Sequence, residues 1–397
     1  MIPDSVMARL KAAEWLTRPE TQQLFALLDG HKGRTRAVGG IVRDTLLDRW
    51  RDRPEVDFAT ELKPDEVMRR AGERGIPVYP TGIEHGTVTL KLGDLIAEVT
   101  TLREDVETDG RHAVVRFGTD WRRDAERRDF TLNALYAGAD GALFDPLGGV
   151  DDCLAGVVRF IGDADQRIAE DRLRVYRFFR FSASHGQEVF DRAGLEAVRR
   201  AAGDLAGLSA ERVGAEMRRI LALSKAARTL ATMTEAGILV FPHELVNWLG
   251  AYERRANKPN LRGRLALLVE ALGSEGLKER WRLSNDDVAL AERVLSASRL
   301  LGEFRVNEAA YRFPAALADA IDVAATLANW TEAGKSAVLQ HLEGIEVPTF
   351  PLSGNDLIAR GMKPGPALGA ELERLETRWI ASNFKLGRGE LLADLRL

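Results

Sequence analysis

The stretches GGIVRD at residues 39–44 and EVDFAT at residues 55–60 decide the fold of the first third of this chain. The pattern predicts a short strand, a tight turn at Gly39-Gly40 and then a helix. Glycines at such a turn let backbone N–H groups approach a phosphate chain, and the N-terminus of the helix adds a favourable field. Arg43, one turn into the helix, is placed to pair with phosphate oxygens. These residues form a candidate phosphate site.

Two carboxylates follow on the next strand. Glu55 and Asp57 are two residues apart, so on a strand their side chains point to the same face while Val56 and Phe58 pack on the core. Two carboxylates beside a triphosphate form a site for phosphoryl transfer with two Mg²⁺ ions. Taken separately, the glycine turn and the strand also fit an ordinary turn and a solvated strand face. Their spacing favours the functional interpretation.

The pattern of apolar and polar residues changes near residue 149. Before it, strand-like runs alternate with helical segments, and the polar residues 103–124 show no period, which predicts a long mobile loop. After it, apolar residues follow helical spacing almost to the end. The sequence therefore predicts an α+β N-terminal part, with a mixed sheet and helices, followed by an all-α remainder.

The amino-acid composition narrows the possible classes of protein. The 397 residues are 45% hydrophobic and 29% charged, which is typical of a globular chain of several domains. The longest apolar runs are far shorter than the roughly 20 residues of a membrane span, and the N-terminus lacks a secretory signal pattern. The single cysteine, Cys153, suits a reducing cytoplasm. The net charge of −4 argues weakly against nucleic-acid binding. The six histidines show no ligand spacing, so we expect no zinc site.

Five motifs in order give a family resemblance. GGIVRDTLLDR with EVDFAT, RRDFTLNAL at 127–135, DPLGGVDD at 145–152, EDRLR at 170–174 and a final LSAERVGAEMRRIL lie between about residues 34 and 222. Together they resemble the class II (bacterial-type) tRNA CCA-adding enzymes and poly(A) polymerases, most closely the CCA tRNA nucleotidyltransferases. The resemblance implies template-independent addition of C, C and A to the 3′ end of tRNA from CTP and ATP, with release of pyrophosphate and with Mg²⁺ as cofactor.

The same resemblance implies a domain order. We expect an N-terminal helical extension at 1–30, a nucleotidyltransferase head at 31–155, a neck with a base-reading helix at 156–225, and a helical body and tail that bind tRNA at 226–397.

The resemblance also implies a third carboxylate. Glu98 lies on a predicted strand between Ala97 and Val99; it is expected beside the strand of Glu55 and Asp57, where a carboxylate assists the attacking 3′-hydroxyl. An ordinary exposed glutamate is the alternative. The chain departs from the family at Glu55, where the family usually has aspartate. Because this residue is an expected metal ligand, the coordination of the metal is where we expect the chain to differ most from the family.

The segment EDRLR carries the expected base specificity. Asp171 and Arg174 are three residues apart and would share one face of a helix. By resemblance this pair reads the incoming base: Asp171 accepts from the amino group of cytosine or adenine, and Arg174 donates to the ring nitrogen. Uracil and guanine reverse both contacts and leave these groups unsatisfied. An ordinary Asp–Arg helix pair is the alternative.

Further basic residues have roles only by resemblance. Arg127 or Arg128 is expected to reach the triphosphate, and Arg177 and Arg180 match arginines that contact phosphate, although Arg180 lies about half a helical turn from Asp171. In the C-terminal segment, Lys363 and Gly365 are expected to hold RNA phosphate, or else to serve helix packing.

Other functions stay open at this point. A poly(A) polymerase shares the scaffold, and some relatives add only the final A. A CC-only enzyme is disfavoured because the DGRH loop at residues 109–112 is present. From another class, the chain could be an inactive RNA-binding protein with Glu55 as the lesion. The expected partners are tRNA, CTP and ATP, and no membrane.

Overall fold

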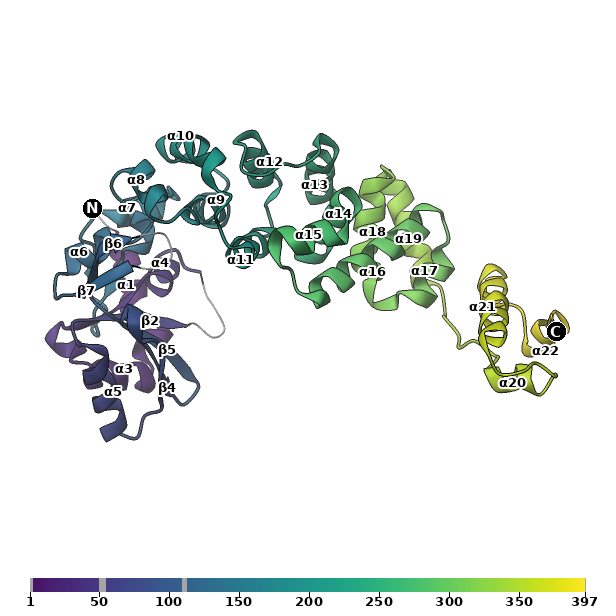
Figure 1. The fold of residues 1–397 in the computed structure, drawn as a ribbon, viewed down its shortest axis with the longest axis horizontal. Helices are drawn as coiled ribbons and strands as arrows, with labels where there is room; N and C mark the ends of the chain where they lie inside the picture. Colours follow the sequence, from purple (N-terminus) through teal and green to yellow (C-terminus); the bar gives the residue numbers. More distant parts are fainter. Residues whose placement is uncertain (1–2, 50–54, 109–112, 397) are drawn as a thin grey trace. The chain divides into compact units, whose positions relative to one another are not determined.

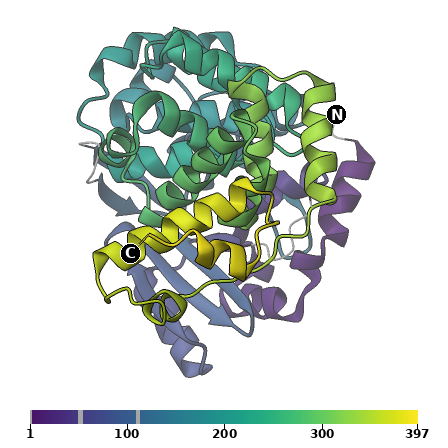
Figure 2. The ribbon, with the colours of Figure 1, turned by 90° about the vertical axis from the view of Figure 1, so that its right-hand side faces the viewer.

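The computed structural model describes residues 3–49, 55–108 and 113–396 (Figure 1). It forms two units, and each is described by itself. The first comprises Met1–Ile220 and Arg228–Val240, and the second comprises Leu221–Ala227 and Phe241–Leu397. Every named strand lies in the first unit and carries the purple and blue colours of the N-terminal third (Figures 1 and 2).

A seven-stranded mixed sheet organises the first unit, in the order β3-β4-β5-β2-β1-β8-β9. Strands β2 and β5 run parallel, and the other pairs described in this sheet are antiparallel. The strands are β1 (Thr35–Val38), β2 (Val56–Thr60), β3 (Val78–Gly82), β4 (Thr87–Leu92), β5 (Leu95–Thr101), β8 (Tyr136–Ala137) and β9 (Leu143–Phe144).

One face of this sheet is the core, because alternate side chains on β2, β4 and β5 are apolar. Phe58 and Val99 are buried there, and the ring of Phe25 meets that of Phe58 edge to face at 5.0 Å. Burying a side chain of this size stabilises the fold by about 1.5–3 kcal/mol. On the other face Asp57 and Glu98 are exposed, whereas Ala59 on β2 is buried.

Helices alternate with the strands along the sequence and then continue the chain after β9. Those of the first unit are α1 (Asp4–Ala12), α2 (Glu14–Thr17), α3 (Pro19–Leu27), α4 (Gly40–Leu46), α5 (Pro64–Glu73), α6 (Trp121–Glu126), α7 (Gly149–Ala155), α8 (Ala164–Glu170), α9 (Arg174–His185), α10 (Arg192–Ala201) and α11 (Ala210–Leu221). Helix α12 (Ala227–Glu235) begins at the boundary between the two units.

The predicted mobile loop at residues 103–124 is wrong. Strands β6 (Arg103–Thr108) and β7 (Ala113–Phe117) pair as an antiparallel hairpin. Helix α6 follows, and the carboxylate of Asp120 caps it by accepting from the backbone N–H groups of Arg122 and Arg123. The missed signals were local: an Asp-Gly pair is typical of a hairpin turn, and an aspartate before a helix indicates its start. The DGRH residues themselves, 109–112, lie outside the described residues.

The second unit is built from helices. They are α13 (His243–Arg255), α14 (Leu261–Leu272), α15 (Ser274–Trp281), α16 (Asn285–Gly302), α17 (Val306–Arg312), α18 (Leu317–Leu327), α19 (Glu332–Glu343), α20 (Gly354–Ile358), α21 (Pro366–Ala381) and α22 (Arg388–Ala393). The predicted fold class, an α+β part followed by an all-α part, is confirmed. No helix within residues 3–49, 55–108 and 113–396 is long and apolar enough to cross a membrane.

A fully buried arginine organises the start of the second unit. Nη1 of Arg264 donates to the carbonyl oxygens of Leu221 at 2.7 Å and Leu223 at 2.5 Å, and Nη2 donates to Glu253 at 2.5 Å. Glu253 in turn accepts from the backbone N–H groups of Ala226 and Ala227. The ion pair therefore supplies hydrogen-bond partners to backbone groups of Leu221, Leu223, Ala226 and Ala227.

Candidate active site

The turn between β1 and α4 needs glycine. Gly39 has φ 75° and ψ −124°, a conformation that side chains oppose. Its N–H donates to the carbonyl of Leu135 at 3.0 Å, and its own carbonyl accepts from the N–H of Arg43 at 3.0 Å. Helix α4 begins directly at Gly40. The turn predicted from the sequence is therefore present and is fixed from both sides.

Arg43 does not reach outward from this turn as predicted. It is buried, with 4% of the residue exposed. Its Nε donates to Asp44 at 2.9 Å, and its Nη1 donates to Oδ1 of Asn133 at 2.5 Å. The guanidinium also lies over the ring of Phe181 at 5.2 Å. These partners turn the side chain toward the protein interior, so Arg43 holds the site together in this structure.

Arg128 lies closer to the turn than the sequence could show. A Cβ built on Gly39 would lie 3.9 Å from Nη1 of Arg128. Nη2 of Arg128 donates to Asp124 at 3.2 Å, and Nη2 of Arg127 lies 2.7 Å from the other oxygen of the same carboxylate. Of the two arginines, the structure brings Arg128 to the glycine turn.

The carboxylate between these arginines is buried and charged. Burial opposes ionisation of Asp124, but Arg128 and Arg127 outweigh it and lower the pKa of the carboxyl. The hydroxyl of Tyr136 also donates to it at 2.9 Å, and burial raises the pKa of Tyr136. Asp124 therefore anchors both guanidinium groups with a full negative charge.

Asp57 and Glu98 are brought together as the sequence predicts. They are register partners on the parallel strands β2 and β5, so their side chains leave the same face of the sheet, and both are exposed. Glu55 is exposed too, but β2 begins at Val56, so Glu55 lies just before the strand and not on it. Among the described residues, no three acidic, histidine or cysteine side chains form a complete metal site.

The expected helical pair of Asp171 and Arg174 is corrected by the structure. Helix α9 begins at Arg174, and Asp171 precedes it in an extended conformation. One oxygen of Asp171 accepts from the N–H of Leu173 at 3.1 Å, and the other accepts from Arg212 at 2.9 Å. Arg174 instead donates to Glu170 at 2.7 Å. The short turn between α8 and α9 breaks the helical period that the spacing suggested.

Arg177 and Arg180 also have protein partners. Arg177 donates to the buried Asp129 through Nε at 2.7 Å, and Asn133 donates to the other oxygen of that carboxylate at 3.1 Å. Because Asn133 accepts from Arg43, this chain of contacts joins α9 to the glycine turn. Arg180 donates to Glu216 at 2.5 Å.

Sequence reasoning missed the role of helix α11. Arg212 and Glu216 on this helix supply the partners of Asp171 and Arg180. They are four residues apart within the last motif, so they lie on one face of the helix. That spacing was the available signal for a surface that contacts the EDRLR segment.

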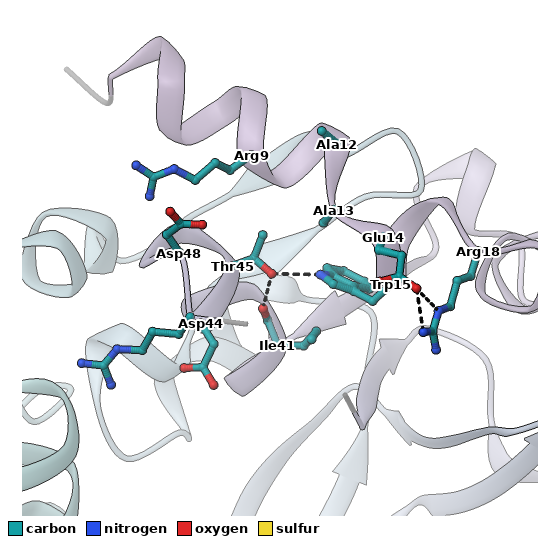
Figure 3. Close-up of a pocket in the computed structure, with 11 residues that line it drawn as sticks. Arg9, Ala12, Ala13, Glu14, Trp15, Arg18, Ile41, Asp44, Thr45 and Asp48 are labelled. Carbon is teal, nitrogen blue, oxygen red and sulfur yellow. Dashed lines mark hydrogen bonds and ion pairs between the residues drawn. The ribbon is translucent and has the colours of Figure 1, made fainter. Parts of the chain in front are cut away.

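The N-terminal helices brace helix α4 from the other side. The indole N–H of Trp15 donates to the hydroxyl of Thr45 at 2.9 Å, and that hydroxyl donates to the carbonyl of Ile41 at 2.7 Å (Figure 3). Arg9 caps the end of the helix through the carbonyl of Leu46 at 2.9 Å. A cavity of about 320 Å³ remains between these helices. The extension thus supports the element that begins at the glycine turn.

The predicted RNA contacts in the second unit stay predictions. Lys363 is exposed, and Gly365 directly precedes helix α21.

Two family models match parts of the chain. Residues 35–159 match the family described as the Poly A polymerase head domain, and residues 190–243 match the one described as the probable RNA and SrmB-binding site of polymerase A.

Two relatives extend the similarity to most of the chain. It is 34% identical over 377 residues to the Danio rerio protein "CCA tRNA nucleotidyltransferase 1, mitochondrial", covering 91% of this chain and 86% of the relative. It is 33% identical over 353 residues to the CCA-adding enzyme of Geobacillus thermodenitrificans, covering 82% of both.

Solved structures share the fold. The Bacillus stearothermophilus CCA-adding enzyme, solved in complex with CTP, has a TM-score of 0.74 at 27% identity and covers 92% of this chain and 94% of its own. The Thermotoga maritima CCA-adding enzyme, solved with tRNA, has a TM-score of 0.68 at 18% identity and shows the same fold.

Proposed function

The chain belongs to the CCA tRNA nucleotidyltransferases, and from this premise we propose that Asp57, Glu98 and Glu55 form its catalytic centre. The enzyme adds C, C and A to the 3′ end of tRNA from CTP and ATP. The observation that carries the proposal is the register of β2 and β5, which places Asp57 directly beside Glu98 on an exposed face.

The reaction is a phosphoryl transfer without a covalent enzyme intermediate. The 3′-hydroxyl oxygen of the tRNA attacks the α-phosphorus of CTP or ATP in line, and the bond from that phosphorus to the bridging oxygen breaks to release pyrophosphate. Glu98 accepts the proton of the hydroxyl, since a carboxylate beside the reacting group serves as a general base. Asp57 faces the same reacting atoms from the neighbouring strand.

The carboxylates suit Mg²⁺. This ion binds oxygen ligands and takes one or two carboxylates together with substrate phosphates, and Asp57 and Glu98 present carboxylates on one exposed face. Asp57 and Glu55 would hold it. When bound, two Mg²⁺ ions neutralise charge on the triphosphate and favour deprotonation of the hydroxyl.

The glycine turn and Arg128 hold the triphosphate in this proposal. The position of the Arg128 guanidinium near Gly39 supports it, as does the charge on Asp124 that fixes this guanidinium. Arg127 also pairs with Asp124. Arg43, Arg177 and Arg180 act through their buried partners to hold α9 and the glycine turn in place.

Asp171 and Arg174 read the base once it enters. Each oxygen of Asp171 has a second lone pair, so the carboxylate can accept from the amino group of cytosine or adenine while keeping its bonds to Leu173 and Arg212. Arg174 must turn part of its guanidinium from Glu170 toward the ring nitrogen. The helices of the second unit bind the tRNA by shape and backbone, and the cytoplasm is the compartment we propose.

One experiment tests the proposal against its rivals. Purified protein is incubated with tRNAs that end at the discriminator base, at C or at CC, each with one labelled nucleotide. A CCA-adding enzyme incorporates C into the first two and A into the third. Incorporation of A alone into the third would identify an A-adding enzyme, long A tails would identify a poly(A) polymerase, and binding without incorporation would identify an inactive RNA-binding protein.

A further inference from the structure

The open face of the sheet continues beyond the two carboxylates. Asp57 is the register partner of Glu98, Glu98 of Thr89 on β4, and Thr89 of Tyr79 on β3. Partners in a sheet point to the same side, so these four residues form one row across four strands. Strands lie about 4.8 Å apart, which puts the backbone of Tyr79 about 14 Å from that of Asp57.

The row lies in a surface whose chemistry differs from the core face. Tyr79 is 50% exposed and Ile96 on β5 is 53% exposed, whereas Val88 and Leu90 on the opposite face of β4 are fully buried. Folding leaves both of these apolar side chains in solvent, so both can contact a ligand that binds on the face of the two carboxylates.

Hydroxyl groups and one cation complete this surface. The hydroxyls of Thr81 and Thr89 lie 2.8 Å apart. Lys91 is exposed and is the register partner of Ile96. An aromatic ring, hydroxyls and a lysine on an open sheet are groups that bind single-stranded RNA, because a base stacks on the ring and a phosphate pairs with the cation.

We propose that this face binds the single-stranded 3′ end of the tRNA, and that Tyr79 stacks on a base that precedes the terminal nucleotide. The inference rests on the proposed function, which places the reactive 3′-hydroxyl at Asp57 and Glu98. The nucleotides behind that hydroxyl must leave the centre, and the row leads from the carboxylates across Thr89 to Tyr79. Stacking accepts any base, which suits a 3′ end whose sequence changes as C, C and A are added.

The edge strand favours RNA over a protein partner at this surface. A protein would add a strand along β3, the outermost strand of the sheet. Pro80 follows Tyr79 in that strand and has no N–H to donate, which weakens strand addition. The ring of Tyr79 remains available to a base.

The test uses a fluorescent base and needs no catalysis. The full-length enzyme is mixed, without nucleotides, with tRNAs that carry 2-aminopurine at the discriminator position and end there, at C or at CC. Stacking quenches this fluorophore. Tyr79→Ala removes the ring, Tyr79→Phe keeps it, and Val189→Ala removes another exposed apolar side chain of the same unit as a control.

We expect quenching with at least one of these tRNAs in the wild type, Tyr79→Phe and Val189→Ala, and its loss in Tyr79→Ala at saturating enzyme. Tyr79→Ala should also raise KM for tRNA by about 5- to 150-fold, the usual effect of losing one stacked base, with KM for CTP unchanged. Equal quenching in the wild type and Tyr79→Ala with every tRNA would overturn the proposal. Since this readout involves no nucleotide addition, it fails independently of the roles assigned to Asp57 and Glu98.

Discussion

Asp171→Asn replaces one acceptor oxygen of the proposed base-reading group with an amide that donates. Oδ1 can keep the bond from the N–H of Leu173, so the amide nitrogen takes the position of the oxygen that accepts from Arg212. In the proposal this position also meets the base. There it can satisfy the carbonyl of uracil or guanine, and it can no longer accept from the amino group of cytosine or adenine. We expect preference for CTP and ATP to fall and UTP or GTP incorporation to become measurable.

The magnitudes separate this effect from a loss of stability. The pair between Arg212 and Asp171 is partly exposed, with 37% and 28% of the two side chains accessible, so losing it costs about 0.2–1 kcal/mol at most. A lost base contact costs about 1–3 kcal/mol, or roughly 5- to 150-fold in selectivity.

The assay is single-nucleotide addition to tRNA ending at CC or C, with each of the four nucleotides separately. Arg212→Met is the matched control, because it breaks the same ion pair and leaves the carboxylate in place; it should keep discrimination against UTP and GTP. Undiminished discrimination in Asp171→Asn would refute the base-reading role and leave Asp171 as a partner of Arg212 alone.

Three further predictions concern other parts of the molecule. Arg128→Ala and Arg127→Ala each remove one partner of the buried Asp124. Only Arg128→Ala should raise KM for both CTP and ATP strongly, by roughly 10- to 150-fold, which is the effect of losing a charge-assisted hydrogen bond. Equal effects of the two variants would contradict the placement of Arg128 at the triphosphate. Arg264→Leu should lower the free energy of unfolding by about 3–5 kcal/mol in urea titrations, because it removes the cationic partner of the partly buried Glu253 and the donor to the carbonyls of Leu221 and Leu223. The exposed Arg262→Leu should change it by less than about 1 kcal/mol. Burial lowers the pKa of His185 to about 4, so as the pH falls the imidazole is protonated in the unfolded chain before it is protonated in the folded one. The free energy of unfolding should therefore fall by about 3 kcal/mol as the pH drops from 6.5 to 4. A His185→Gln variant whose stability has the same pH profile as the wild type would contradict this.

The sequence predicted the parts of the site that depend on local pattern. Alternation of apolar and acidic residues placed Asp57 and Glu98 on an exposed face, and the two glycines placed the turn before α4. Both depend on residues close together in the chain, for which strand and turn periodicity is a direct signal.

The sequence did not predict contacts set by distant segments. Arg43 is turned inward by Asn133, ninety residues further along the chain. Asp171 pairs with Arg212 on another helix, and the turn before α9 interrupts the helical spacing to Arg174. Such pairings follow from how helices pack on the sheet, which one-dimensional spacing does not contain. The resemblance supplied the roles of these residues, and the structure supplied their partners.

The claim that Asp57 and Glu98 form the catalytic centre is tested most directly by Asp57→Ala. Nucleotide addition to tRNA is measured beside tRNA binding by the same protein, with Glu55→Asp as the companion variant. Because Asp57 is exposed and serves chemistry, we expect Asp57→Ala to lose CTP and ATP incorporation while binding tRNA like the wild type, and Glu55→Asp to stay active. Wild-type incorporation by Asp57→Ala would contradict the proposed centre.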